Sequence, residues 1–372
     1  MTPLDSRIAS LLAAIASEPR PSGSPAITAA RERCARELRE DGYDVREQPF
    51  EFSEFPGRFA TPLLGGSASL IVGFAGASGA RGARILPLAL LVLGAIALVV
   101  SGQWLARRGV LAAPLMRQRG VNLEAVPRGQ EPDVWLCAHL DSKSQPVPTL
   151  VRSAGIVLES LGYLATLAIA ATAAIGWGGE PRPAYWTLAA VVTLVGAIPV
   201  VLSIVGWRSP GALDNASGVV AVLQAARDLK GQGIGVVITD GEELGLAGAR
   251  AWAQQRKRGT VLNCDGADDK GRIVAMFTGA KPTRILSAIA EATESSALHC
   301  DAMRMFPGVL TDSVAFTDAG LESVTFSRGS WRSLARVHSG RDNLAHLGGT
   351  GVAEVQTLMR LTAIQLRGEA AH

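Results

Sequence analysis

The sequence predicts an α/β fold in which helices sandwich a mostly parallel mixed sheet, with four inserted transmembrane helices in two hairpins. Three observations predict it. Short apolar strands alternate with helical segments over most of the chain, as in a sheet covered on both faces. Two uncharged segments are long enough to cross a membrane. Mean hydropathy is +0.23, and only 19% of the 372 residues are charged, which is low for a soluble domain.

Charge and cysteine content exclude several classes of protein. Lys and Arg total 36 against 33 Asp and Glu, a net charge of +3, so nucleic acid is not an expected partner. The four cysteines form no CxxC pair, which favours reduced thiols over a disulfide framework. Near the N-terminus, Asp5 and Arg7 interrupt the apolar residues. We therefore expect no cleavable signal peptide.

The elements of the α/β part follow one another along the chain. Residues 26–40 have helical periodicity, and residues 43–52 alternate like a strand. Short apolar strands then follow at 133–141, 235–243, 260–266 and 322–327. Helical patterns separate or follow them at 216–230, 246–258, 283–293 and 349–366. Ligands of such sheets gather beyond the carboxyl ends of the strands, so we expect the functional site there.

The apolar excess lies in four segments. Residues 85–104 and 185–207 contain no charge, residues 59–80 are uncharged but rich in glycine, and residues 154–177 contain only Glu159. Whether 59–80 spans fully stays open, and Glu159 is either an intramembrane or an interfacial acid. Pairing the segments gives hairpins at 59–106 and 154–207. The remaining ranges, 1–58, 107–153 and 208–372, then form one discontinuous catalytic domain.

The arginines around the hairpins predict sidedness. Two hairpins return the chain to the side that it left, so all polar segments share one side. More arginines flank the segment ends on that side than occupy the hairpin turns, which hold Arg81, Arg84 and Arg182. By the positive-inside rule, we expect a multi-pass protein of the cell membrane with its catalytic domain in the cytoplasm.

Acidic and histidine residues fall at the predicted strand ends and in the loops near them. They are His139, Asp214, Glu242, Glu243, Asp265 and His338. With one of the two glutamates counted, they offer five oxygen and nitrogen ligands without thiolate, which suit a two-metal site for zinc or a similar divalent ion. The chain lacks HExxH, GxSxG and GxxxxGK[ST] patterns, which excludes the common zincin, serine-hydrolase and P-loop sites.

Several strings are similar to those of a known family. "AHLDS", "GALDNASGVVAVLQAAR", "VITDGEELGLAGARAW", "LNCDG" and "VHSGRDNLAHL" resemble the di-zinc aminopeptidases and glutamate carboxypeptidases of metallopeptidase family twenty-eight. The resemblance runs through the polar ranges in the family's order, and the hairpins fall outside it as insertions. It implies a zinc-exopeptidase fold and a hydrolase that uses two Zn²⁺ per chain.

The resemblance also implies a role for each site residue. His139, Asp214 and Asp265 would hold one zinc, and Asp214, Glu243 and His338 the other, with Asp214 bridging. Glu242 would be the general base. Asp141 would accept the second ring N–H of His139 and fix its tautomer, and Asp342 would do the same for His338.

One departure from the family concerns the oxyanion. These peptidases often use a tyrosine from the C-terminal half to polarise the tetrahedral intermediate, but no tyrosine follows Asp265. A metal ion, Trp331 or Arg332 are the alternatives that the sequence leaves open. Cys137 and Cys264 neighbour ligand positions, but as small apolar strand residues they need no catalytic role.

Three functions follow from these observations. The first is a membrane-embedded zinc exopeptidase, foremost an aminopeptidase, that acts on peptide or related amide bonds. The second uses one zinc, as in glutaminyl cyclases, or cleaves lipophilic acyl amides. The third is a non-catalytic scaffold. The expected partners are the substrate and the lipid bilayer. The sequence determines neither the substrate side chain that the site prefers nor the oligomeric state.

Overall fold

The computed structural model describes residues 3–306 and 308–369. Two compact units divide the chain. The first unit comprises Met1–Phe52, Met116–Ser144 and Trp207–His372, and the second comprises Ser53–Leu115 and Gln145–Gly206. The domain boundaries expected from the sequence stay a prediction.

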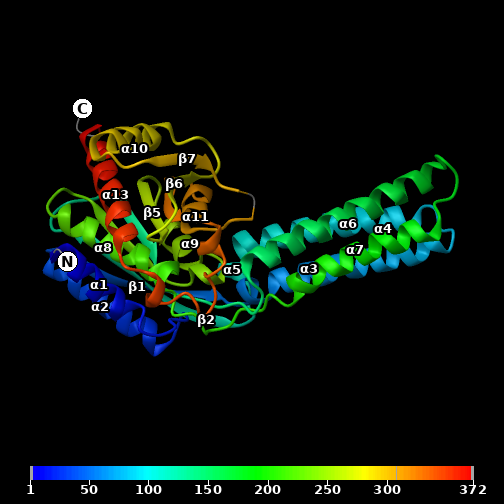
Figure 1. Cartoon of the computed structure of the whole chain (residues 1–372), viewed down its shortest axis with the longest axis horizontal. Helices are drawn as coiled ribbons and strands as arrows, with labels where there is room; N and C mark the ends of the chain where they lie inside the picture. The colour runs from blue at the N-terminus through cyan, green and yellow to red at the C-terminus, as the bar shows by residue number, and fades with distance from the viewer. Residues whose placement is uncertain (1–2, 307, 370–372) are drawn as a thin grey trace. The chain divides into compact units, whose positions relative to one another are not determined.

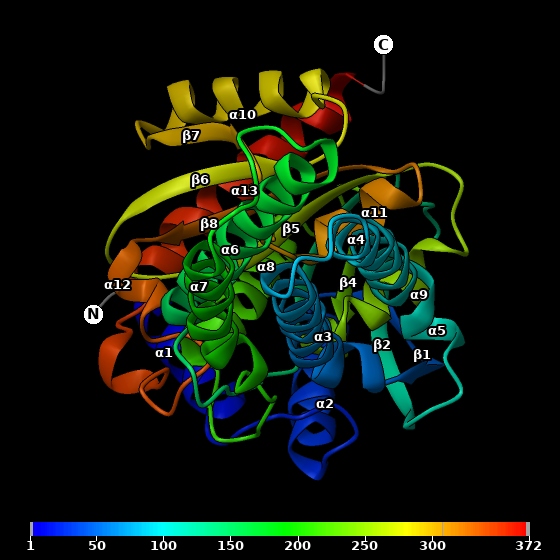
Figure 2. The same ribbon diagram turned by 90° about the vertical axis from the view of Figure 1, so that its right-hand side faces the viewer.

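An eight-stranded sheet forms the centre of the first unit, in the order β1-β2-β4-β3-β5-β8-β6-β7 (Figure 2). The strands are β1 (Tyr43–Ser53), β2 (Arg117–Pro127), β3 (Val134–His139), β4 (Gly235–Thr239), β5 (Thr260–Ala267), β6 (Arg272–Phe277), β7 (Cys300–Arg304) and β8 (Glu322–Gly329). β3 runs parallel to β4 and β5, and β5 runs parallel to β8. β2 and β6 are antiparallel to their neighbours β4 and β8. The predicted mixed α/β fold is confirmed, with four parallel strands at its centre.

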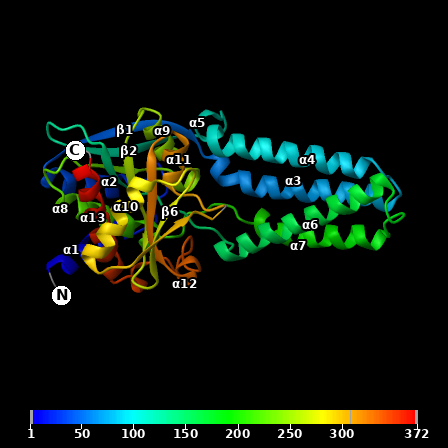
Figure 3. The ribbon, with the colours of Figure 1, turned by 90° about the horizontal axis from the view of Figure 1, so that it is seen from above.

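Helices cover both faces of this sheet (Figure 3). One face packs against α1 (Pro3–Ile15), α2 (Pro25–Glu40), α8 (Gly218–Asp228), α10 (Thr283–Ser296) and α13 (Thr350–Glu369). The other face packs against α9 (Ala247–Ala253) and α11 (Asp312–Asp318). Alternate residues of β3 divide between the two cores, Leu136 in the first and Cys137 in the second. Burial on both faces explains why the central strands read as continuous apolar runs.

Three strands and two short helices of this unit were not predicted, and the helices are α11 (Asp312–Asp318) and α12 (Trp331–Leu334). β7 is an edge strand with no fully buried residue, so it lacks an apolar signal. β2 carries charged residues at its exposed start, and β6 has only six residues. α11 has seven residues, which is too short for helical periodicity to show.

The second unit consists mainly of four long helices (Figure 1). They are α3 (Phe55–Ala80), α4 (Leu86–Trp104), α6 (Thr149–Ile175) and α7 (Pro183–Val201), and a π-turn (Leu105–Gly109) and the short α5 (Val110–Ala112) continue α4. By length and composition, each is long and apolar enough to cross a membrane. α7 ends six residues before the expected Trp207. Pro199 lies in its last turn and has no backbone N–H to donate. The hydroxyl of Ser203 donates a hydrogen bond to the carbonyl of Pro199, so the regular backbone hydrogen bonds of the helix end here.

The four helices expose many large apolar residues and bury several small and polar ones, beside a small apolar core that includes Trp186. Phe74, Leu93 and Leu188 are 64–68% exposed. Gly162 lies so close to Thr193 that a Cβ would collide with the threonine, so only glycine allows this approach of α6 to α7. Glu159 is buried in the same bundle and accepts a hydrogen bond of 3.2 Å from Ser69. This distribution is the reverse of that in a water-soluble bundle.

Candidate metal centre

The parallel strands bring four predicted site residues to one edge of the sheet. Because β3, β4, β5 and β8 run in the same direction, their carboxyl ends share that edge. His139 is the last residue of β3, and Asp265 lies near the end of β5. Glu242 and Glu243 begin the short 3₁₀ turn that follows β4. The topology therefore places these residues at one edge of the sheet.

Asp214 comes from the turn Ala212–Ser217 that leads into α8, and two side chains fix it. The carboxylate of Asp342 accepts the backbone N–H groups of Leu213 and Asp214 at 2.6 and 3.1 Å. The amide of Asn215 donates to the carbonyl of Cys264 at 2.8 Å. This second contact ties the Asp214 turn to the residue before Asp265.

Two groups of side chains form at this edge and share Asp214. In the first, Nε2 of His139 lies 3.3 Å from Oδ1 of Asp214 and 3.6 Å from Oδ1 of Asp265. In the second, Nε2 of His338 lies 3.0 Å from Oδ2 of Asp214 and 3.4 Å from Oε2 of Glu243. Each group offers ligand atoms within 4.8 Å of one another. Asp214 thus presents one carboxylate oxygen to each group.

The residues present fit divalent cations. Nε2 of His139 and Oε1 of Glu243 are buried without a hydrogen-bond partner, although buried polar atoms are normally paired. Five imidazole and carboxylate ligands without thiolate are a donor set that zinc accepts. Burial lowers the pKa of His139, but Glu242, Asp141, Asp214 and Asp265 outweigh burial and raise it well above the usual value. The same negative charge would attract a cation.

Glu242 lies beside the first group. Its Oε2 is 4.0 Å from Nε2 of His139, and the side chain is buried. Burial raises the pKa of Glu242 well above its ordinary value. A carboxylate with a raised pKa accepts a proton more readily than an exposed one, as a general base must.

Asp141 is placed differently from the sequence expectation. Nδ1 of His139 lies 3.1 Å from the backbone carbonyl of Asp141 and 3.6 Å from its Oδ1, so the carbonyl is the nearer acceptor. The carboxylate of Asp141 accepts the backbone N–H groups of Glu242 and Glu243, each at 3.0 Å. Asp141 therefore positions the two glutamates as well as the histidine. Asp342, expected to orient His338, instead accepts the two N–H groups at Asp214 described above.

Comparison with known proteins identifies the fold of this unit. Residues 197–363 match the model of Peptidase family M28. This segment is therefore similar to Peptidase family M28. The match and the aminopeptidase structures support a metallopeptidase-like hydrolase, the class that the resemblance in the sequence implied. No curated protein matches the chain.

Solved structures resemble the chain at low sequence identity. A zinc aminopeptidase from Bacillus subtilis is 14% identical with a TM-score of 0.56, covering 97% of this chain and 94% of the other. An aminopeptidase from Aneurinibacillus sp. strain AM-1 is 12% identical with a TM-score of 0.55, covering 97% and 93%. A glutaminyl cyclase from Fimbriiglobus ruber is 16% identical with a TM-score of 0.53, covering 98% and 96%. At these identities the similarities concern the fold alone.

Arg20 is a buried residue of the first unit that the sequence did not single out. It is 1% exposed, and its guanidinium donates to the carbonyls of Ile15, Leu140, Pro210 and Gly211. Burial lowers its pKa to about 10. Leu140 follows His139 directly, and Gly211 lies three residues before Asp214. Arg20 thus joins the two backbone segments that carry ligands of the first group.

Lys143 and Asp312 also lie at the site without having been predicted. Nζ of Lys143 is 2.5 Å from Oε2 of Glu243. Asp312, the first residue of α11, accepts the hydroxyl of Thr239, and burial raises its pKa to about 7. Proximity to "HLDS" was the only sequence signal for Lys143, and nothing in its pattern marked Asp312.

The cysteines and the oxyanion candidates add little to the site. Burial raises the pKa of Cys137 well above its usual value, so its thiol stays protonated, and a protonated thiol is a poor nucleophile. Trp331 is 67% exposed, and the guanidinium of Arg332 lies 5.3 Å from its ring centre. A role for either residue at the oxyanion stays a prediction.

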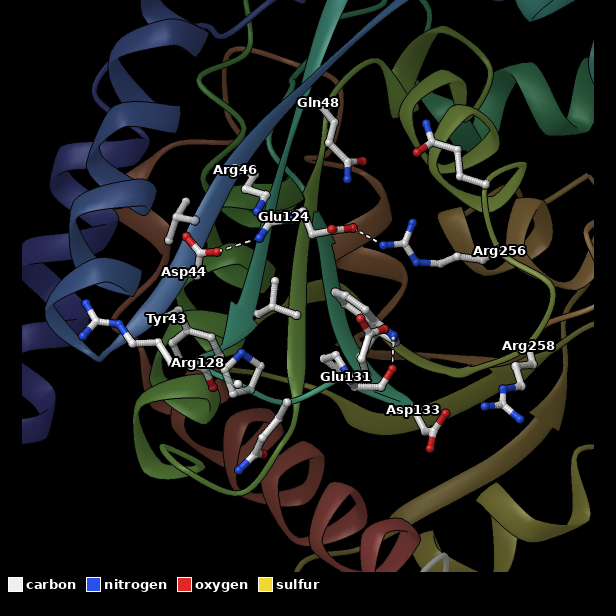
Figure 4. Close-up of a pocket in the computed structure, with 18 of the residues that line it drawn as sticks. Tyr43, Asp44, Arg46, Gln48, Glu124, Arg128, Glu131, Asp133, Arg256 and Arg258 are labelled. Carbon is white, nitrogen blue, oxygen red and sulfur yellow. Dashed lines mark hydrogen bonds and ion pairs between the residues drawn. The ribbon is translucent and has the colours of Figure 1, made fainter.

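A cavity of about 1190 Å³ lies elsewhere in the first unit (Figure 4). Its lining includes Asp133 and Trp135, at the amino end of β3, whereas His139 is at the carboxyl end. Glu124 forms an ion pair with Arg256 there. None of the predicted site residues lines this cavity, so it is distinct from the metal centre.

Proposed function

We propose that the chain is a membrane-embedded zinc-dependent exopeptidase, foremost an aminopeptidase, that hydrolyses peptide or related amide bonds. The observation that carries this proposal is the pair of ligand groups that share Asp214, with Glu242 beside them. His139, Asp214 and Asp265 would hold one zinc ion, and Asp214, Glu243 and His338 the other. The match to the M28 family supports the hydrolytic class.

The residues of the site have separate tasks in this reaction. Two zinc ions would supply positive charge that acidifies water and polarises the scissile carbonyl. Glu242 takes the proton of the attacking water as the new C–O bond forms, and it gives that proton to the amine as the C–N bond breaks. Asp141 holds the backbone of Glu242 and Glu243 in place, and Asp342 holds that of Asp214.

A substrate panel tests the enzymatic part of the proposal. Purified, zinc-loaded protein in detergent should release the N-terminal residue from short peptides, and N-acetylated peptides of the same sequence should resist, because an aminopeptidase requires the free amine. A chelator should abolish the reaction and zinc should restore it, since the ligands alone do not acidify water. Release from the carboxyl end, or cleavage only of acyl amides, would contradict the aminopeptidase assignment. Absence of any turnover would favour the non-catalytic scaffold.

The second unit supports membrane embedding. Its four helices expose large apolar side chains and bury small and polar ones, which suits contact with lipid. The excess of arginines on the side of the polar segments supports a cytoplasmic catalytic domain.

We expect the full chain to remain in the membrane pellet after alkaline extraction, because four spanning helices do not partition into water. A cysteine at Ser10, an exposed position in α1, should react with an impermeant maleimide in inside-out vesicles only. Release into the supernatant would contradict embedding, and reaction only in right-side-out vesicles would contradict the cytoplasmic side.

Glutaminyl cyclisation is a second candidate function. The structure named as a glutaminyl cyclase covers 98% of this chain. In that reaction the amine of an N-terminal glutamine would attack its own side-chain amide and release ammonia. Peptides with N-terminal glutamine in the substrate panel separate the two functions, because ring closure releases ammonia and leaves the peptide bond intact.

A further inference from the structure

We infer that Lys143 makes the two cation positions unequal, so that the Asp214–Glu243–His338 position binds zinc more weakly than the His139–Asp214–Asp265 position. This inference rests on the metal centre of the proposed function. It concerns the affinity and order of metal binding, which neither the family match nor the structural similarities address.

Lys143 lies at the second group of ligands. Its Nζ is 2.5 Å from Oε2 of Glu243, the same oxygen that lies 3.4 Å from Nε2 of His338. The lysine side chain is 14% exposed and that of Glu243 is 2% exposed, so water screens the contact little. A lysine carries its positive charge at neutral pH. A unit positive charge therefore already lies against one ligand of the second position.

A zinc ion at this position would repel the ammonium of Lys143. Zinc binds a carboxylate oxygen at about 2.0–2.2 Å. If it used Oε2 of Glu243, Lys143 would have to move away. If it used Oε1, which has no hydrogen-bond partner, two positive charges would lie on the two oxygens of one carboxylate. Either arrangement costs electrostatic free energy. Among the residues that the structure describes, no lysine forms an ion pair within the first ligand group, so the first position carries no such cost.

Local sequence explains why Lys143 lies there. It follows Asp141 by two residues, just beyond the end of β3. Asp141 accepts the backbone N–H of Glu243, and the hydroxyl of Ser142 donates to the carbonyl of Ser209. These contacts fix the backbone before Lys143. Just after it, the hydroxyl oxygen of Ser144 accepts the backbone N–H of Arg208 at 2.9 Å, so the lysine is held next to Glu243.

The test compares zinc binding by the full chain and by Lys143→Met, which keeps much of the side chain's volume and removes its charge. The purified proteins are dialysed against buffers of defined free zinc, and bound metal is counted by elemental analysis. We expect the native chain to bind one zinc tightly and a second only at higher free zinc. In Lys143→Met, the second affinity should rise about tenfold or more, because Coulomb repulsion at these distances exceeds one decade in affinity. Lys143→Gln is a second neutral variant.

Two further variants provide controls. Lys143→Arg keeps the charge and should keep the second site weak. Lys281→Met removes an exposed lysine and should change neither affinity. Thermal unfolding without metal checks that each variant is folded.

Three outcomes would overturn the inference. Equal zinc affinities in the native chain would do so while leaving the proposed function intact. In both folded neutral variants, unchanged second binding would show that Lys143 does not weaken the site, and weaker second binding would show that Lys143 supports it. A native chain that binds no zinc would overturn the inference together with the metal centre. If the native chain binds zinc as expected but hydrolyses no substrate, only the proposed function is contradicted.

Discussion

Replacing Glu242 by glutamine should lower kcat by about 10²- to 10⁴-fold, the usual contribution of a general base, while zinc stays bound. Glutamine has nearly the same shape as glutamate but cannot accept the proton of the attacking water. Glu242 belongs to neither group of ligands, so its loss should not release metal. Peptide hydrolysis and metal content, measured on the same preparation, test both parts of this expectation.

The neighbouring Glu243 provides a matched control. Glu243→Gln changes the same functional group one residue away, but it alters a ligand of the second group. We expect this variant to lose zinc at that position, whereas Glu242→Gln keeps it. Full activity in Glu242→Gln would exclude Glu242 as the base, and loss of metal from it would show that Glu242 is a ligand instead.

Replacing Arg20 by methionine should lower the free energy of unfolding of the first unit by about 3–5 kcal/mol. Methionine fills much of the volume, but it leaves four backbone carbonyls without a donor in a buried site. For a unit of this size, we expect Tm to fall by about 10 °C. We also expect weaker zinc binding, because the backbone next to His139 and Asp214 loses its shared anchor.

Arg36→Met is the control for this substitution. Arg36 is exposed on α2, so its loss should change Tm little. Thermal unfolding in detergent, followed at fixed free zinc, measures both proteins. An equal Tm for the two variants would mean that Arg20 contributes no more than a surface arginine.

The sequence predicted the central strands because burial on both faces gives them continuous apolar runs. β3, β4, β5 and β8 were found for this reason, whereas β7 was missed because it is a half-exposed edge strand. The end of α7 was also missed, since apolar residues continue for six positions beyond its last helical turn. A hydropathy profile does not detect that Pro199 lacks the backbone N–H that would continue the helix.

The site was predictable where a residue type signals its own chemistry. Histidines and carboxylates at predicted strand ends indicate a candidate metal site. The structure brings five of them into two groups, namely His139, Asp214, Asp265, Glu243 and His338. Arg20 acts through backbone carbonyls that come from distant parts of the chain, so no local pattern reveals it. The carboxylate of Asp141 contacts the backbone of Glu242, 101 residues away, and only tertiary structure shows that pairing.

The discontinuous chain of the first unit has a consequence for biosynthesis. β3, which carries His139, lies between β4 and β5, and both of these strands follow the second hairpin in the chain. A ribosome therefore completes α6 and α7 before β3 has either neighbour and before Asp214 exists. If these helices insert into the membrane during translation, metal uptake is a late step of assembly, and a nascent chain stalled before β4 holds no complete ligand group.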